Sequence, residues 1–300
     1  MTSEQITSFD QMELAKPLLK ALVDVGYESP SPIQAQTIPL LLEGRDVLGQ
    51  AQTGTGKTAA FALPILSRLD MKQKDPQVLV LAPTRELAIQ VAEAFQKYAT
   101  HMKGFHVLPV YGGQDYSGQI RALKRGVHVV VGTPGRVMDH MRKGTLKLNQ
   151  LSTLVLDEAD EMLSVGFKEQ VYNIFQFLNK DVQVCLFSAT LPREIETLTE
   201  KFMRNPIKIL VKSEMLTLEG INQYYIALED DNSKYETLKD LYNTISTTQS
   251  IIYCNSIKRV EDLYTAMNED CYPVTRIHGN MDKEERTEAY MDFKSGSSRV

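Results

Sequence analysis

Residues 46–58 read DVLGQAQTGTGKT, a short apolar run followed by a glycine-rich turn that ends in Lys57 and Thr58. Between a strand and a helix, such a turn aims several backbone N–H groups at one point, where they bind phosphate. The lysine then reaches the β and γ phosphates, and the threonine hydroxyl binds Mg²⁺. The stretch therefore predicts an α/β domain with a phosphate-binding loop at 51–58.

The loop departs from the general pattern at one position, where Ala51 replaces a glycine. A small side chain still fits there, so the prediction stands. The alternative is a glycine-rich turn that binds no ligand. The predicted nucleotide contacts of the loop are Ala51, Gln52, Thr53, Gly54, Thr55, Gly56, Lys57 and Thr58.

Apolar runs rich in Val, Ile and Leu recur through residues 1–212, and each leads into a turn and a helix-length segment. The runs are apolar on both faces, as expected of parallel strands that helices cover on each side. They predict a doubly wound α/β domain with a parallel sheet. The expected strands are 46–49, 78–82, 107–111, 127–131, 154–156, 184–187 and 207–211.

Residues 213–220 interrupt this alternation with polar residues and a glycine, which favours a linker. A chain of 300 residues also exceeds one hydrophobic core of ordinary size. We therefore expect a second α/β domain over 221–300, incomplete because its pattern stops as a strand begins. Its expected helices lie near 234–245, 260–267 and 283–293, and its expected strands at 224–228, 251–254, 274–277 and 298–300.

Composition argues against a membrane or secreted protein. No run of eighteen apolar residues occurs, and residues 1–10 do not resemble a secretory signal, so we expect a cytoplasmic protein without a membrane span. The three cysteines, Cys185, Cys254 and Cys271, are far apart in sequence. Their spacing favours reduced residues over a metal site or a disulfide.

The net charge of −5 is unevenly distributed. Residues 1–212 hold 24 basic and 22 acidic residues, a net charge of +2, whereas residues 213–300 hold 9 and 16, a net charge of −7. A weakly basic first domain does not exclude a nucleic-acid partner, because backbone N–H groups and helix N-termini also bind phosphates.

A cluster of acidic residues follows the predicted strand at 154–156. The sequence LVLDEAD places Asp157, Glu158 and Asp160 at the carboxyl end of that strand, where open α/β sheets bind ligands. There Asp157 would hold Mg²⁺ through water, and Glu158 would accept a proton from the attacking water. Acidic residues after a strand also cap helices, so this interpretation depends on the neighbouring phosphate loop.

Together with the order of further motifs, the sequence DEAD at 157–160 resembles the motif that names the DEAD-box RNA helicases. The resemblance covers nearly the whole chain. It implies two RecA-like domains, ATP and Mg²⁺ as cofactors, and RNA contacted mainly through its sugar-phosphate backbone. It also implies ATP hydrolysis coupled to local unwinding of RNA duplexes, and it allows for regulatory protein partners.

Residues 26–34, GYESPSPIQ, resemble the adenine-binding Q motif of that family, with the expected aromatic residue, Phe9, seventeen positions before Gly26. The side-chain amide of Gln34 would present a donor and an acceptor to the adenine edge, and Tyr27 would stack on the ring. The alternatives are a glutamine that caps a helix and a buried tyrosine.

The sequence SAT at 188–190 ends another predicted strand and resembles the family motif that couples hydrolysis to strand separation. Its hydroxyl groups are expected to hydrogen-bond Asp160 or Glu158 and so respond to the nucleotide state. A helix N-cap is the simpler alternative, and the two are compatible. The predicted catalytic residues are Lys57, Asp157, Glu158, Ser188 and Thr190.

Three further segments, 83–88, 112–113 and 133–136, lie at strand ends that lead into helices. Helix N-termini with nearby Arg and Thr donors suit sugar-phosphate backbones, although each segment alone is more often a capped turn. The resemblance assigns them to RNA binding, together with two segments of the second domain. The predicted RNA-binding residues are Arg85, Gly113, Thr133, Arg136, Asn255 and Arg286.

The family pattern continues to a motif with Arg, Gly and Asp, and then to a His-Arg-x-Gly-Arg motif whose arginines face the γ phosphate. Neither motif occurs in this sequence, so we expect a fragment with impaired turnover. The alternative function is a non-catalytic, ATP-bound module that binds RNA or protein. A P-loop kinase or a DNA motor would share only the phosphate loop.

Overall fold

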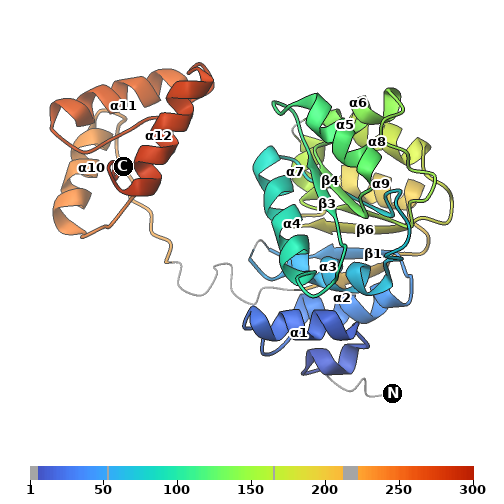
Figure 1. Ribbon diagram of the computed structural model, residues 1–300. Helices are drawn as coiled ribbons and strands as arrows, with labels where there is room; N and C mark the ends of the chain where they lie inside the picture. Colours follow the sequence, from blue (N-terminus) through green and yellow to red (C-terminus); the bar gives the residue numbers. More distant parts are fainter. Residues whose placement is uncertain (1–5, 53, 165, 212–221) are drawn as a thin grey trace. The chain divides into compact units, whose positions relative to one another are not determined.

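The computed structural model describes residues 6–52, 54–164, 166–211 and 222–300 (Figure 1). The chain separates into two compact units, residues 1–218 and 219–300. The predicted linker at 213–220 lies outside the described residues, as do Lys212 and Ile221 at the expected domain ends and Thr53 in the phosphate loop.

A seven-stranded parallel sheet forms the centre of the first unit, in the order β3-β4-β2-β5-β6-β1-β7. Each strand predicted from the sequence of this unit is present, with ends that differ by two residues or fewer. The strands are β1 (Val47–Gln50), β2 (Val78–Leu81), β3 (Val107–Val110), β4 (Val129–Gly132), β5 (Thr153–Leu156), β6 (Gln183–Ser188) and β7 (Ile207–Leu210).

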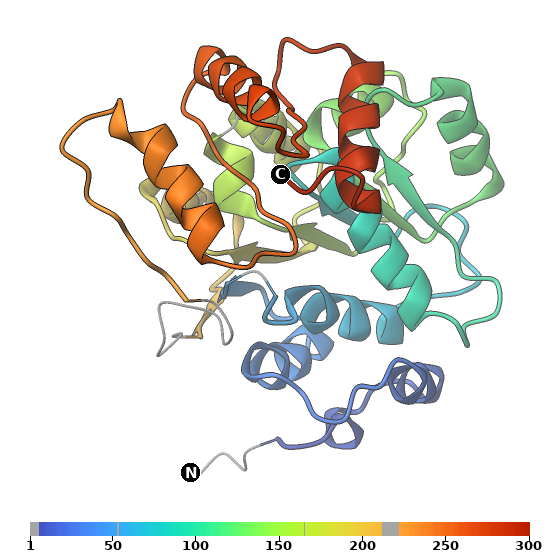
Figure 2. The ribbon, with the colours of Figure 1, turned by 90° about the vertical axis from the view of Figure 1, so that its left-hand side faces the viewer.

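Helices cover both faces of the sheet, which confirms the doubly wound α/β fold. Alternate strand residues face opposite sides: Val78 and Val80 belong to one buried cluster, and Leu79 and Leu81 to the other. The first cluster includes η1 and α1–α4, and the second includes α6–α9. Figures 1 and 2 show the helices on both sides of the sheet. The helices are η1 (Phe9–Met12), α1 (Lys16–Asp24), α2 (Pro32–Leu42), α3 (Lys57–Arg68), α4 (Arg85–Tyr98), α5 (Tyr116–Arg125), α6 (Pro134–Arg142), α7 (Ala159–Ser164), α8 (Lys168–Gln176) and α9 (Arg193–Phe202).

Two residues hold β1, and hence the loop that follows it, against the neighbouring strands. The buried Asp46 carboxylate accepts the N–H of Val184 at 3.0 Å and the N–H of Arg204 at 2.7 Å. A Cβ atom on Gly49 would lie 2.8 Å from the Phe187 ring, closer than real Cβ contacts. Only glycine therefore lets β1 approach β6 at this point.

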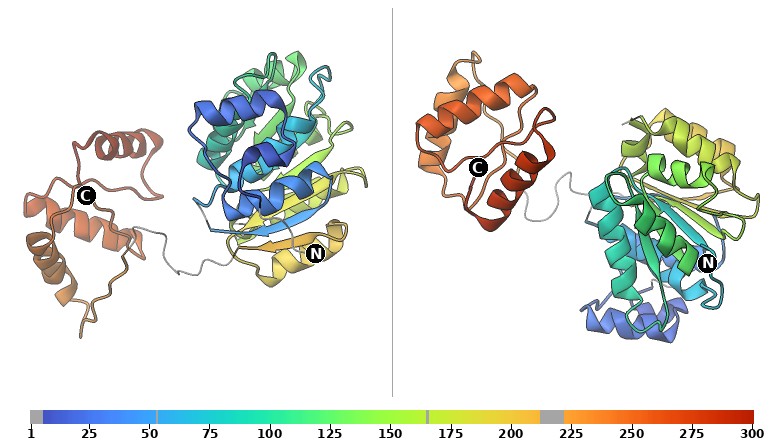
Figure 3. Two further views of the ribbon diagram at one scale, coloured as in Figure 1. Left: turned by 90° about the horizontal axis from the view of Figure 1, so that it is seen from below. Right: turned by 45° about the horizontal axis from the view of Figure 1, so that its top comes forward.

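The second unit contains the three expected helices, joined by segments without strand geometry (Figure 3). They are α10 (Ser233–Thr244), α11 (Ile257–Glu269) and α12 (Lys283–Ser295). The predictions of strands at 224–228, 251–254, 274–277 and 298–300 are wrong, because the structure assigns no strand within residues 222–300. In the part of the chain that the structure describes, no helix has the length and apolarity needed to cross a membrane.

Incomplete backbone pairing explains the absence of strands from the described part of this unit. The N–H of Arg299 donates to Pro273 O at 2.8 Å, and the N–H of Thr275 donates to Val300 O at 2.9 Å, so 273–275 and 298–300 lie side by side. Apolar side chains of the extended segments remain exposed, including Tyr224 at 89% and Tyr253 at 91%. A buried parallel strand needs neighbours on both edges and cover on both faces, which these segments lack.

This difference in packing predicts uneven hydrogen exchange. Helix α10 buries none of its residues and α11 buries only Met267, whereas β2 and β5 are buried throughout. Amides of α10 and α11 should therefore exchange much faster than those of β2 and β5 when followed by mass spectrometry. Equal protection of α11 and β5 would contradict the prediction.

Candidate functional site

The strand order divides the carboxyl edge of the sheet into two halves. Strands β5, β6 and β1 are neighbours, and β5 and β1 lead into Asp157 and the phosphate loop at 51–58. Strands β3, β4 and β2 are also neighbours, and they lead toward Gly113, Thr133 and Arg85. The predicted phosphate-binding and RNA-binding segments of the first unit therefore occupy adjacent halves of one edge, where open α/β sheets bind ligands.

The phosphate loop ends at the N-terminus of α3. Gly54 and Gly56 adopt left-handed backbone angles, with φ of 85° and 89°, which L side chains rarely adopt. Inside the loop, the Thr55 hydroxyl donates to Gln52 O at 2.7 Å. Lys57 is the first residue of α3 and is 5% exposed. The positive end of a helix dipole at this position favours an anion.

An ion pair joins this loop to the acidic cluster. Lys57 Nζ lies 2.6 Å from Glu158 Oε1, and only 6% and 14% of the two side chains are exposed. Glu158 has a φ of 49°, a left-handed conformation that is uncommon for a side chain of this size. Backbone strain of this kind is frequent at functional sites.

Asp157 is the buried carboxylate of the cluster. Its Oδ1 accepts the N–H of Glu158 at 3.1 Å, and its own N–H donates to Leu81 O at 2.9 Å. Burial raises the pKa of Asp157 to about 6, and the nearby charge of Lys57 opposes this shift. A buried carboxylate of this kind is stabilised by an added cation.

The side chains at this edge suit Mg²⁺. The hydroxyl of Thr58 and the carboxylate of Asp157 are oxygen donors, and Mg²⁺ commonly takes one or two protein carboxylates together with water and phosphate oxygens. Among the described residues, no group of three or more His, Cys, Asp or Glu side chains could hold a metal by itself. The donor set therefore fits an ion bound together with nucleotide phosphates.

The third acidic residue connects β5 to β6. Asp160 Oδ2 accepts the Thr190 hydroxyl at 2.7 Å and the Thr190 N–H at 2.9 Å, and the Asp160 N–H donates to Ser188 Oγ at 3.3 Å. Burial acts to raise the pKa of Asp160, but the hydrogen bonds from Thr190 and Ser188 outweigh it and lower this pKa. The SAT segment and the acidic cluster are therefore held as one unit.

Gln34 contacts the phosphate loop. Its Oε1 caps the N–H of Ser31 at 2.9 Å, and its Nε2 donates to Gly56 O at 3.2 Å. The structure thus shows the helix-capping alternative, together with a contact to the loop. Adenine binding by Gln34 stays a prediction, and the amide has a second N–H donor and a second lone pair on Oε1 that these two bonds do not use.

The two aromatic residues predicted near adenine lie together. The rings of Phe9 and Tyr27 are stacked with centroids 6.2 Å apart, and the Tyr27 hydroxyl lies 3.1 Å from that of Tyr98. Phe9 is buried and Tyr27 is half-buried. Their contact with a nucleotide ring stays a prediction.

The predicted RNA residues of the first unit also lie close together. A Cβ atom on Gly113 would lie 3.8 Å from Arg85 Nη1, and the Arg85 guanidinium lies 5.6 Å from the ring centre of Tyr111. Arg136 Nη1 donates to Gln119 Oε1 at 3.1 Å. The N–H of Thr133 donates to Val110 O at 3.0 Å, which joins the ends of β4 and β3.

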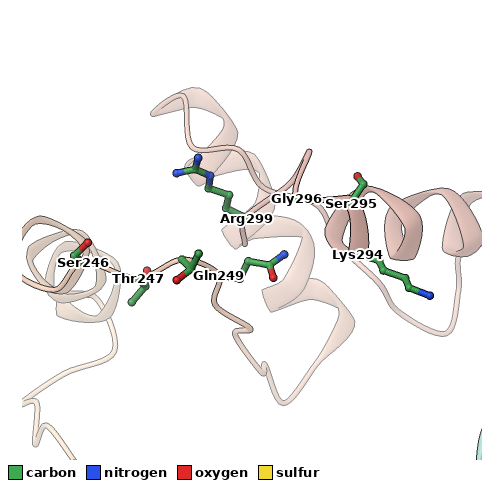
Figure 4. A pocket seen from close by; sticks show the side chains of 8 residues that line it. Ser246, Thr247, Gln249, Lys294, Ser295, Gly296 and Arg299 are labelled. Atoms are coloured by element: carbon green, nitrogen blue, oxygen red, sulfur yellow. The ribbon is translucent and has the colours of Figure 1, made fainter.

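In the second unit, both predicted RNA residues are exposed. Asn255 precedes α11, and Arg286 lies in the first turn of α12, where its Nε donates to Asp282 O at 3.3 Å. A hollow of about 540 Å³ lies elsewhere in this unit (Figure 4). Lys294 and Arg299 line it, but the C-terminal end of α12 lies there too, and its dipole disfavours phosphate.

Two contacts of the site escaped the sequence analysis. The Ser31 hydroxyl donates to Thr55 O at 2.8 Å, and the Gln50 side chain donates to Ala189 O at 3.1 Å. The first contact joins residues 24 positions apart, and the capping-box spacing Ser31-x-x-Gln34 predicts only the start of α2. No local pattern marks the second, because it joins residues 139 positions apart.

Family comparisons agree with this arrangement. Residues 31–198 match the DEAD/DEAH box helicase family, and residues 233–300 match the helicase conserved C-terminal domain. The chain is 47% identical over 295 residues to eukaryotic initiation factor 4A of Caenorhabditis elegans, a match that covers 98% of this chain and 73% of that protein. It is 45% identical over 302 residues to ATP-dependent RNA helicase fal1 of Schizosaccharomyces pombe, covering 100% and 76%.

Solved structures give the same result. Saccharomyces cerevisiae Dbp5 bound to RNA and ADP BeF3 is similar, with a TM-score of 0.83 and 33% identity, over 98% of this chain and 74% of that one. A DEAD box protein from Methanococcus jannaschii is similar, with a TM-score of 0.67 and 34% identity, over 98% and 79%. The chain therefore belongs to the DEAD-box family of ATP-dependent RNA helicases.

Proposed function

We propose that this chain binds ATP with Mg²⁺ in its first unit and couples ATP hydrolysis to binding of the RNA backbone and to local duplex unwinding. One observation supports this most directly. The phosphate loop and the acidic cluster share the Lys57–Glu158 pair at 2.6 Å, and Asp160 bonds Thr190 at 2.7 Å. Lys57, which would bind phosphate, thus contacts Glu158, which would act as the base. Asp160 lies in the same cluster and contacts the segment after β6.

The pairing of Lys57 suggests how the nucleotide acts on this site. The phosphates of ATP would compete with Glu158 for the Lys57 ammonium group, which leaves the Glu158 carboxylate to accept a proton from water. Thr58 and Asp157 would hold Mg²⁺, which supplies neutralisation of the phosphate charge when it is bound. Phe9, Tyr27 and Gln34 would contact the adenine.

The hydrogen bonds of Asp160 connect the acidic cluster to the SAT segment at 188–190. A shift of the acidic cluster on hydrolysis would alter the bonds from Asp160 to Thr190 and Ser188. The RNA phosphates would lie on Arg85, Gly113, Thr133 and Arg136, with Asn255 and Arg286 contributing from the second unit. These contacts carry no base readout, so binding would depend little on base sequence.

The proposal also covers the rate of turnover, protein partners and the location of the protein. Residues 1–300 hold neither arginine motif described for the family, so their turnover would be slow even with RNA. Saccharomyces cerevisiae Dbp5 has been solved with Gle1, a protein partner, which supports regulatory partners here as well. We place the protein in the cytoplasm.

Replacing Lys57 should abolish ATP binding. In Lys57→Ala the charge that reaches the phosphates is lost, so calorimetry should detect no ATP binding at concentrations that saturate the wild type. The exposed Lys72 serves as the control, and Lys72→Ala should leave the affinity unchanged. Unchanged affinity in Lys57→Ala would contradict the phosphate-loop assignment.

Replacing Glu158 by its amide should separate binding from chemistry. Glu158→Gln retains the side-chain shape and loses the base, so ATP affinity should persist while turnover falls roughly 10²- to 10⁴-fold. Glu161→Gln, at an exposed position of α7, should change neither quantity. Turnover in Glu158→Gln equal to that of the wild type would contradict the assignment of Glu158 as the base.

RNA affinity should depend on charge and not on base sequence. Arg136→Ala should weaken binding of unrelated single strands of equal length to the same degree, and should reduce the slope of log affinity against log salt by about 1. Arg45→Ala, at an exposed position before β1, should leave both unchanged. A tenfold preference of the wild type for one such strand would rule out backbone recognition.

A further inference from the structure

One buried amide contacts two of the segments predicted to bind RNA. Gln119 lies on α5 and is 3% exposed. Its Nε2 donates to Tyr111 O at 3.2 Å, and Tyr111 directly precedes the glycine pair at 112–113. Its Oε1 accepts Arg136 Nη1 at 3.1 Å, from the first turn of α6.

The partners determine the orientation of this amide. A backbone carbonyl such as Tyr111 O only accepts, and a guanidinium such as that of Arg136 only donates, so the nitrogen and oxygen of Gln119 cannot be exchanged. Gln119 Nε2 also lies 3.4 Å from Gln114 Oε1, just beyond the glycine pair. The amide therefore contacts both ends of the glycine turn with its nitrogen and the α6 arginine with its oxygen.

A buried histidine also contacts the side-chain oxygen of Gln119. His140 is fully buried, with Nε2 2.9 Å from Gln119 Oε1 and Nδ1 2.8 Å from Thr145 Oγ1. Burial lowers the pKa of His140 to about 4, and the nearby charge of Arg136 adds to this effect. The ring is therefore neutral at ordinary pH. Because Gln119 Oε1 only accepts, His140 carries its proton on Nε2.

Aromatic packing restricts Arg136 further. The Tyr116 ring is stacked on His140 with centroids 4.3 Å apart and planes 4° apart, and the Arg136 guanidinium lies 5.1 Å from the Tyr116 ring centre. Tyr111 in turn lies beneath Arg85, at 5.6 Å from its guanidinium. Gln119 is thus at the centre of a network that reaches three predicted RNA segments from α5, which itself carries none of them.

We propose that Gln119 is a positioning residue for RNA binding, which holds the glycine pair at 112–113 and the Arg136 guanidinium in one fixed relative geometry. The inference rests on the proposed RNA function. Phosphates along an RNA strand are spaced regularly, so two protein segments that contact one strand must keep their separation. The amide provides this constraint because both of its ends are buried and bonded.

The test compares two replacements of Gln119 in the 300-residue chain. Gln119→Met keeps the approximate shape and loses both ends of the amide, whereas Gln119→Glu keeps an acceptor for Arg136 and His140 and loses the donors to Tyr111 and Gln114. Binding of a fluorescein-labelled oligouridylate is followed by anisotropy in the presence of an ATP analogue, and ATP affinity is measured by calorimetry. Gln119→Met should weaken RNA binding about tenfold and leave ATP affinity within about twofold, as expected for loss of one charge-assisted hydrogen bond. Gln119→Glu should show a smaller loss.

Gln77 supplies a matched structural control. It is also buried, at 6% exposure, and its amide exchanges two hydrogen bonds with the Asp70 backbone, at 2.9 and 2.8 Å, just before β2. Gln77→Met should lower Tm without changing RNA affinity. The double variant Gln119→Met with Arg136→Ala should lose less RNA affinity than the two single losses multiplied together, since Gln119 acts partly through Arg136.

Each outcome decides the proposal. Wild-type RNA affinity in a Gln119→Met chain that still binds ATP would overturn this inference alone, as would equal losses of RNA affinity in Gln119→Met and Gln77→Met. If Gln119→Met fails to fold, unchanged RNA affinity in folded Gln119→Glu would overturn it. If the wild-type chain does not bind RNA at all, the proposed RNA function is wrong and this inference is wrong with it.

Discussion

The parallel direction of all seven strands is the constraint on which the site depends. Because every strand of the first unit runs the same way, the loops that follow β1 to β6 emerge at one edge, although their residues are spread from Ala51 to Thr190. Helices on both faces bury the strands between them. The buried Asp46 carboxylate and the contact of Gly49 with Phe187 keep β1 in register beside β6.

The order of the strands places the predicted nucleotide-binding segments and the predicted RNA-binding segments on different groups of strands. β5, β6 and β1 carry the phosphate loop and the acidic cluster, whereas β3, β4 and β2 carry the segments assigned to RNA. The halves meet where the Asp157 N–H donates to Leu81 O, between β5 and β2. Within the first half, Asp160 connects β5 to β6 through Thr190. Hydrogen bonds of Asp157 and Asp160 therefore link the acidic cluster to two neighbouring strand ends.

Strands that have neighbours on both edges and helices on both faces were predictable, whereas segments of the second unit whose neighbours are incomplete were wrongly predicted as strands. The run 78–82 is apolar on both faces and forms β2, buried between two helical layers. The run 251–254, IIYC, is also apolar, but in the second unit its Ile251 and Tyr253 remain exposed and it forms no strand. Sequence patterns report the tendency of a segment to be buried, and the actual burial depends on which neighbours are present.

The sequence by itself determined the chemistry of the site, because the glycines at 54 and 56, the lysine at 57 and the acidic run at 157–160 act through properties that each residue carries in any chain. Only the tertiary structure decided which of these groups touch. The Lys57–Glu158 pair joins residues 101 positions apart, and Gln34 bonds the backbone of Gly56. The contacts of Gln119 have no signal in the local sequence, since the fold brings the Tyr111 carbonyl and the Arg136 guanidinium to the two ends of its amide. Such contacts depend on the packing of α5 against β3 and on the position of α6 after β4, which no short stretch of sequence encodes.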